Sequence, residues 1–108
     1  MTEVWASEFS DSEGCYNSNK LDDGKYYYAE LSTNPGAKKK DLDYAALGGL
    51  EKGHKLKITY KGRSLIASKG DKGRGGIDDG VLRQIDLHKT LSKALGFNGL
   101  DYVTIEDA

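Results

Sequence analysis

The stretch that most constrains the fold is residues 70–97, GDKGRGGIDDGVLRQIDLHKTLSKALGF. A glycine-rich loop carrying Asp71 leads into a short apolar strand predicted over residues 82–85, which ends at Asp86. A short amphipathic helix is predicted to start there, from apolar residues at helical spacing, namely Leu87, Leu91, Ala94 and Leu95. Gly96 supplies the stop for that helix. Such an order can place the two carboxylates near one another at the mouth of a small fold.

Glycine is abundant and proline scarce, with 14 and 1 residues in a chain of 108. Glycines between short apolar runs favour tight turns joining short strands, and this length suits one domain. The run KLKITY over residues 55–60 alternates strictly, Lys61-Gly62 predicts a hairpin turn, and residues 63–69 form the returning strand. A tyrosine-rich strand is predicted over residues 25–31, and residues 101–106 form a closing strand. The sequence therefore predicts a mostly β fold.

Residues 1–24 are rich in Ser, Asp, Glu and Asn, and they predict an irregular N-terminal arm with Trp5 as its anchor on the core. The folded domain is expected over residues 25–108. The single cysteine, Cys15, allows no internal disulfide. No basic segment followed by an apolar run indicates a secretory signal, and no apolar run approaches a membrane span. The chain is then expected to be cytosolic as made, exported by other means, or cut from a longer precursor.

The formal net charge of −1 provides no field toward nucleic acid or anionic lipid, so neither partner is expected. The basic run Lys38-Lys39-Lys40 is followed at once by acidic residues and predicts a solvated loop. His54 has no partner at ligand spacing, and the loop has neither EF-hand nor P-loop spacing. We therefore predict no metal and no cofactor.

From the residues alone, each candidate has a structural interpretation beside a functional one. Asp86 fits a helix N-cap, which would favour its charged form and oppose a general acid. Asp71 fits a turn-forming aspartate, and His88 fits an exposed residue in the first helical turn. The tyrosines fit either core positions or sugar-stacking surfaces, and the candidates are Tyr26, Tyr28, Tyr44 and Tyr60.

Residues 50–105 resemble the double-psi β-barrel of the rare lipoprotein A and expansin families. The resemblance is carried by the strand pair KLKITYKGRSLIAS, the D-[RK]-G element at Asp71-Lys72-Gly73, and the hydrophobic-D-L element at Ile85-Asp86-Leu87 that opens a helix ending in L-G. Tyr44-Ala45-Ala46 lies where those families often have T-A-A, and YVTIE resembles their closing strand. His88 stands where they usually have serine, and residues 1–24 lie outside the resemblance. A six-stranded double-psi β-barrel with one or two short helices is the fold that the resemblance implies.

The resemblance implies action on cell-wall polysaccharide, with Asp86 as the key acid and Asp71 as the second carboxylate. Expansins loosen wall networks without hydrolysis, whereas lytic transglycosylases cleave the glycan of peptidoglycan. Substrate-binding side chains are expected to be Tyr26, Tyr28, Tyr44, Tyr60, Lys72 and His88. Two other functions remain open, a non-catalytic wall-binding module and a structural barrel of a larger assembly such as a phage tail. The expected partners are peptidoglycan and other wall or virion proteins, at the bacterial cell wall.

Overall fold

The computed structural model describes residues 1–16 and 19–108, and strands dominate this part of the chain. In chain order the strands are β1 (Thr2–Phe9), β2 (Tyr27–Leu31), β3 (Lys55–Tyr60), β4 (Arg63–Gly73), β5 (Ile77–Asp78), β6 (Val81–His88) and β7 (Leu100–Asp107). The helical elements are the 3-10 turn η1 (Lys39–Asp41) and the α-helix α1 (Lys89–Leu95). Among the described residues, no helix is long and apolar enough to cross a membrane.

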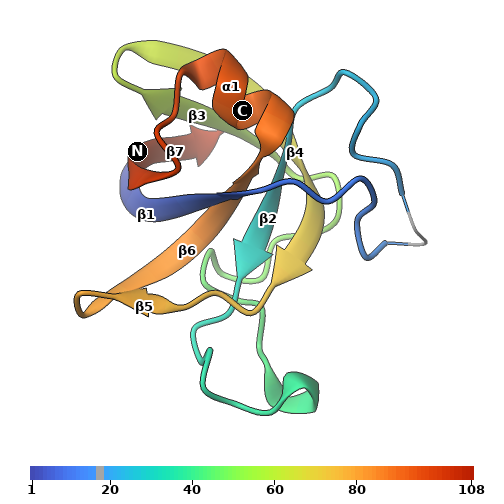
Figure 1. The fold of residues 1–108 in the computed structure, drawn as a ribbon, viewed down its shortest axis with the longest axis vertical. Coiled ribbons are helices and arrows are strands. Elements are labelled where there is room, and N and C mark those ends of the chain that lie inside the picture. The colour runs from blue at the N-terminus through green and yellow to red at the C-terminus, as the bar shows by residue number, and fades with distance from the viewer. Residues whose placement is uncertain (17–18) are drawn as a thin grey trace.

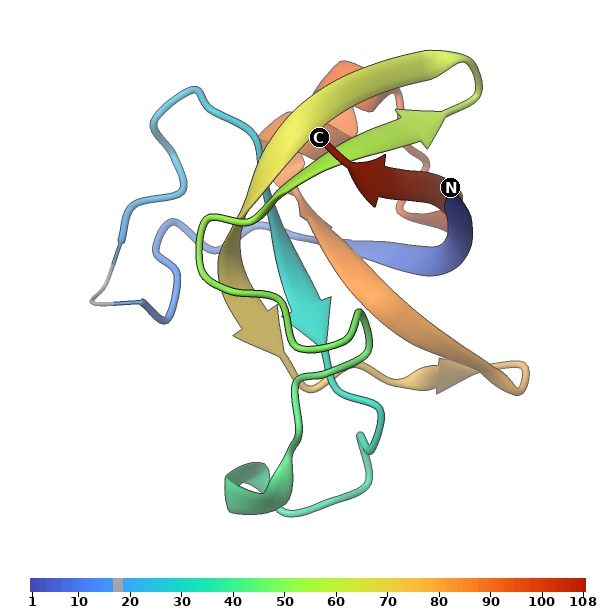
Figure 2. The same cartoon turned by 180° about the vertical axis from the view of Figure 1, so that it is seen from behind.

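Six of the strands form a closed ring in the order β1-β7-β3-β4-β2-β6, which the pairing of β6 with β1 completes (Figure 1). Two neighbouring pairs are parallel, β1 with β6 and β2 with β4, and the other neighbours in the ring are antiparallel. β5 pairs only with β6 and extends beyond the ring. Figure 2 shows α1 at the same end of the barrel as the β3–β4 turn, with the η1 loop at the opposite end. The prediction of a six-stranded, mostly β barrel is confirmed.

The core fills the inside of this ring with alternate residues of each strand. In β3 the predicted inward residues Leu56, Ile58 and Tyr60 are all buried. The hairpin turn is also as predicted, because Lys61 and Gly62 both have positive φ, 47° and 84°, which matches the twist of the flanking strands. The buried cluster joins residues from all six strands of the ring and from α1.

The prediction of an irregular arm over residues 1–24 is wrong for Thr2–Phe9, which form β1. Val4 and Ala6 alternate toward the core, and β1 lies between β6 and β7 and closes the ring. Residues 10–16 and 19–24 follow an irregular path on the outside of the barrel. The part of the prediction that concerns residues 17–18 lies outside the described residues.

Two boundaries in the 70–97 stretch also differ from the prediction. The helix begins at Lys89, because Asp86 pairs with strands on both sides and β6 continues to His88. Asp86 is therefore a strand residue and caps no helix. Asp71 lies in β4, since that strand continues to Gly73 before the chain turns. The helix stop at Gly96 is confirmed, with φ of 68°.

Candidate functional site

Asp86 and Asp71 belong to one row of residues that crosses four neighbouring strands. Ser7 of β1 pairs with Asp86 of β6, Asp86 pairs with Ala29 of β2, and Ala29 pairs with Asp71 of β4. Residues that lie directly opposite one another in a sheet share a face. The neighbours of Asp86 along β6, Ile85 and Leu87, point into the core, so this row lies on the outer face of the barrel.

A β-bulge at Gly70 brings Asp71 onto the outer face. Tyr28 pairs with Lys69, but the next residue of β2, Ala29, pairs with Asp71, so Gly70 is the extra residue. Simple alternation would put Asp71 on the same face as the buried Lys69. The inserted residue reverses the alternation and redirects the side chain, which is a common use of bulges.

The environment of Asp86 shifts the pKa of its carboxyl upward. Burial, the largest influence, raises the pKa of the Asp86 carboxyl, and the negative charges of Asp71 and Asp11 add to that rise. Ser7, whose hydroxyl donates to Asp86 Oδ1, and the Arg83 guanidinium oppose it. Because Asp86 is not at a helix N-terminus, the dipole expected to lower its pKa is absent. A half-buried carboxyl whose pKa is raised by burial is a candidate general acid.

Asp71 has a different environment, on the side of the row where the outer segment of residues 10–16 and 19–24 packs. Its Oδ1 accepts hydrogen bonds from the backbone N–H groups of Cys15, at 3.1 Å, and of Lys72, at 2.8 Å. Asn19 also donates to the Gly70 carbonyl at 3.3 Å. Ala29, which lies between the two carboxylates in the row, is only 3% exposed.

Two of the predicted substrate-binding side chains meet beside Asp71. The Lys72 ammonium lies 4.9 Å from the centre of the Tyr44 ring and 6.0 Å from that of Tyr16. Lys72 is exposed and both rings are half-buried, so the group can be reached from solvent. Tyr26 is half-buried and packs against the core.

The other predicted substrate-binding residues are buried, which corrects their assignment. Tyr28 is 0% exposed and donates to the His54 carbonyl, while Tyr60 packs edge-to-face on Phe97, so neither offers a ring face for stacking. His88 is also 0% exposed, because it ends β6 rather than lying on the surface of the helix. Its Nε2 donates to the Asp11 carbonyl at 2.8 Å, which ties the outer segment to the barrel.

The sequence prediction missed two polar side chains in the site, Ser7 and Arg83. Arg83 Nη1 donates to Ser7 Oγ at 3.3 Å, and this hydroxyl in turn donates to Asp86. The alternation of Val4 and Ala6 with Trp5 and Ser7 was the available signal, since it indicates a strand with Ser7 facing outward.

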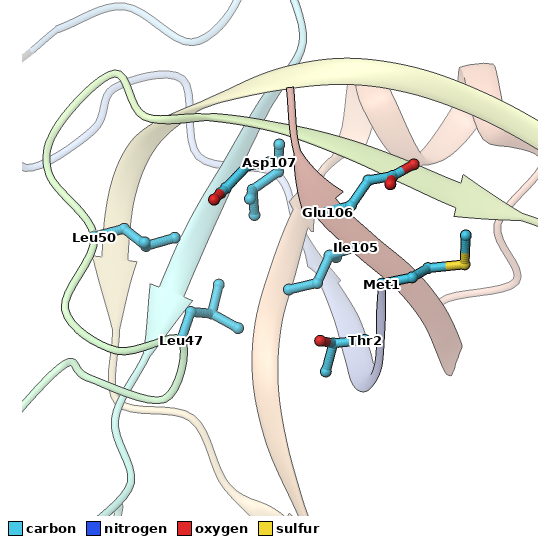
Figure 3. A pocket seen from close by; sticks show the side chains of 8 residues that line it. Met1, Thr2, Leu47, Leu50, Ile105, Glu106 and Asp107 are labelled. Carbon is cyan, nitrogen blue, oxygen red and sulfur yellow. The ribbon is translucent and has the colours of Figure 1, made fainter.

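No cluster of three or more metal-ligating side chains occurs within residues 1–16 and 19–108. A hollow of about 240 Å³ lies elsewhere, between the 44–50 loop and the ends of β1 and β7 (Figure 3). Leu47 and Ile105 project toward the same space there, and neither Asp71 nor Asp86 lines it. The hollow is therefore separate from the carboxylate row.

Comparison with solved structures identifies the fold. The crystal structure of an apo expansin from Clavibacter michiganensis matches with a TM-score of 0.63 and 17% identity, covering 99% of this chain and 50% of that chain. The computationally designed protein msDPBB_sym2, a double-psi β-barrel, matches with a TM-score of 0.52 and 19% identity, covering 99% of this chain and 100% of that chain. This chain thus spans half the length of the expansin chain. No protein-family model and no curated protein sequence matches it.

The chain has the double-psi β-barrel fold, as the sequence predicts, and an expansin is among its structural neighbours.

Proposed function

We propose that this protein acts on a polysaccharide of the bacterial cell wall, with Asp86 as general acid and Asp71 as the neighbouring carboxylate. The observation that carries the proposal is the placement of the half-buried Asp86 in one row with Asp71 on the outer face of the barrel, and burial raises the pKa of Asp86 there. The exposed Lys72 beside Tyr44 adds a cationic and aromatic contact for a glycan. The structural likeness to an expansin supports the same class of substrate.

The proposed reaction is cleavage of peptidoglycan glycan by a lytic transglycosylase mechanism. Protonated Asp86 donates its proton to the glycosidic oxygen as the bond from that oxygen to the anomeric carbon breaks. The 6-hydroxyl of the same sugar then bonds to the anomeric carbon, and the Asp86 carboxylate removes its proton. One acid is sufficient because the nucleophile belongs to the substrate, in contrast to glycosidases with two reacting carboxylates. The negative charge of Asp71 contributes to the raised pKa of Asp86.

The test is digestion of purified peptidoglycan by the wild type, by Asp86→Asn and by Asp71→Asn. Asp79→Asn is the matched control, because Asp79 is an exposed residue outside the row. We expect anhydro-muropeptides from the wild type and the control, none from Asp86→Asn, and a reduced yield from Asp71→Asn. Equal product from Asp86→Asn and the wild type would contradict the role of Asp86.

Two results would assign the chain to another function. Co-sedimentation with peptidoglycan without any cleaved product would indicate a wall-binding or expansin-like module. Neither binding nor cleavage would favour a structural barrel whose outer face is covered by another protein, as in a phage tail. In both alternatives the fold is the same, but Asp86 does not act as a general acid.

A further inference from the structure

We propose that Trp5 and Tyr102, with Arg83 beside them, form a sugar-binding subsite next to Asp86. The inference rests on the proposed function, because the wall glycan is its ligand. Trp5 pairs with Tyr102 of β7 on one side and with Arg83 of β6 on the other. The register of β1 and β6 shifts between Trp5 and Ala6, so Gln84 is an extra residue and Arg83 faces outward although Ile85 points into the core. The three side chains therefore form a second cross-strand row on the outer face.

This second row is the immediate neighbour of the carboxylate row. Trp5 lies two residues before Ser7 along β1, so the two rows are separated by about 7 Å on one face of the sheet. Figure 1 shows β7, β1 and β6 side by side along this part of the barrel. A glycan bound along these strands would pass from the aromatic pair to Asp86 without leaving the surface.

The aromatic pair has the apolar surface that one face of a sugar ring requires. The ring centres of Trp5 and Tyr102 lie 4.6 Å apart with an interplanar angle of 61°, so the two rings fix one another edge-to-face. Tyr102 is 41% exposed, and Trp5 is half-buried. Exposure of a large aromatic side chain on a sheet face is informative when polar groups border it.

Charged and hydrogen-bonding groups border the rings and connect them to the acid. Asp78 Oδ2 lies 3.4 Å from Trp5 Nε1, which donates to it, and 2.9 Å from Arg83 Nε. Arg83 also donates to Ser7, and Ser7 donates to Asp86. Such planar donors and acceptors suit the hydroxyl groups at the edge of a sugar. Arg83 therefore links the subsite to the carboxyl.

Trp5 is the single tryptophan of the chain, so intrinsic fluorescence reports directly on this subsite. The experiment titrates a soluble oligosaccharide of alternating N-acetylglucosamine and N-acetylmuramic acid into the wild type, Tyr102→Ala and Ile66→Ala. Ile66 is the matched control, because it is a 55% exposed strand residue outside both rows. We expect a saturable change of emission in the wild type and the control, and a Kd about tenfold higher in Tyr102→Ala. Circular dichroism verifies that each variant is folded.

Asp86→Asn separates this inference from the proposed function. Wild-type affinity in Asp86→Asn, together with weak binding by Tyr102→Ala, supports the subsite whether or not the glycan is cleaved. Equal Kd values for Tyr102→Ala and the wild type would overturn the subsite even if Asp86 proves essential for cleavage. Absence of any saturable change in the wild type would overturn it as well.

Discussion

At the scale of single residues, the two carboxylates of the outer row have different chemistry. Asp86 accepts a hydrogen bond from Ser7, which itself accepts one from Arg83, and burial is the largest influence that raises the pKa of Asp86. Asp71 accepts two backbone hydrogen bonds and holds the outer segment against the bulge. These surroundings come from three strands and a loop that are distant in sequence, and they support the general-acid role proposed for Asp86.

The first prediction concerns the pH dependence of stability. Because the pKa of Asp86 is higher in the folded state, the native protein binds more protons than the unfolded chain above the ordinary Asp value of about 3.9. Its contribution therefore lowers the free energy of unfolding as pH rises from that value through the folded pKa. Asp86→Asn is expected to unfold at the same temperature as the wild type at pH 3 and at a higher temperature at pH 7.

Thermal unfolding by circular dichroism measures this difference, with Asp79→Asn as the exposed control, for which no pH-dependent gap is expected. A lower unfolding temperature for Asp86→Asn at pH 7 would show that the attraction of Arg83 outweighs burial.

A second prediction concerns Glu30, which is 0% exposed. Its carboxylate accepts hydrogen bonds from the backbone N–H groups of Leu47, Gly49 and Leu50, and from the buried Lys69 ammonium at 2.9 Å. Glu30→Gln leaves that ammonium without its charged partner, so we expect a loss of about 3–5 kcal/mol in the free energy of unfolding.

Urea denaturation is the measurement for Glu30→Gln. Glu106→Gln is the control, because it removes one partner of the solvent-exposed pair between Lys57 and Glu106 and should cost less than about 1 kcal/mol. Equal losses in the two variants would contradict the role of burial.

At the scale of elements, the bulge in β4 decides which face carries Asp71. A Cβ at Gly70 would lie 2.8 Å from Leu21 Cδ2 and 2.9 Å from Tyr27 Cδ1, so any larger residue there would force these side chains to shift. A single extra residue thus connects the buried Lys69 on the inner face with Asp71 on the outer face. The bulge is therefore the local feature that brings Asp71 into the same row as Asp86.

The third prediction tests the role of the β-bulge at Gly70. Gly70→Ala is expected to destabilise the fold by about 1–3 kcal/mol through crowding and to weaken the proposed glycan cleavage by displacing Asp71. Gly36→Ala is the matched control, because a Cβ at Gly36 would have no other atom within 4 Å, and its effect should stay within about 0.5 kcal/mol. Chemical denaturation and the peptidoglycan digest are the two measurements, and equal stability of both variants would contradict the crowding argument.

At the scale of the whole molecule, β1 closes the barrel. It pairs with β7 on one side and with β6 on the other, and it supplies Val4 and Ala6 to the core. Without it, two strand edges would expose unpaired N–H and C=O groups. The first nine residues are therefore part of the folded unit.

The fourth prediction is that a chain truncated to residues 10–108 does not fold. Loss of β1 opens the ring between β6 and β7 and removes Ser7 from the site. We expect a circular dichroism spectrum without a cooperative thermal transition, and aggregation in size-exclusion chromatography. The full chain is the control, and cooperative unfolding of the truncated chain would contradict the closure argument.

Local sequence patterns were sufficient to predict those strands whose residues alternate clearly or which end in a recognisable turn. The strict alternation of residues 55–60, the Lys61-Gly62 turn and the Gly96 stop are properties of neighbouring residues, so they could be predicted from sequence. The resemblance of motifs in residues 50–105 to those of known double-psi β-barrels predicted how the strands assemble into a barrel.

Tertiary pairing decided the rest. Leu87 has helical spacing with later residues and Asp86 fits an N-cap, yet pairing with β1 and β2 keeps both residues in a strand. The role of Ser7 depends on a parallel partner 79 residues away, and the burial of Tyr28 depends on ring closure. Sequence alone determined which segments prefer to be strands, whereas long-range hydrogen bonding between those strands decided which side chains share the outer face.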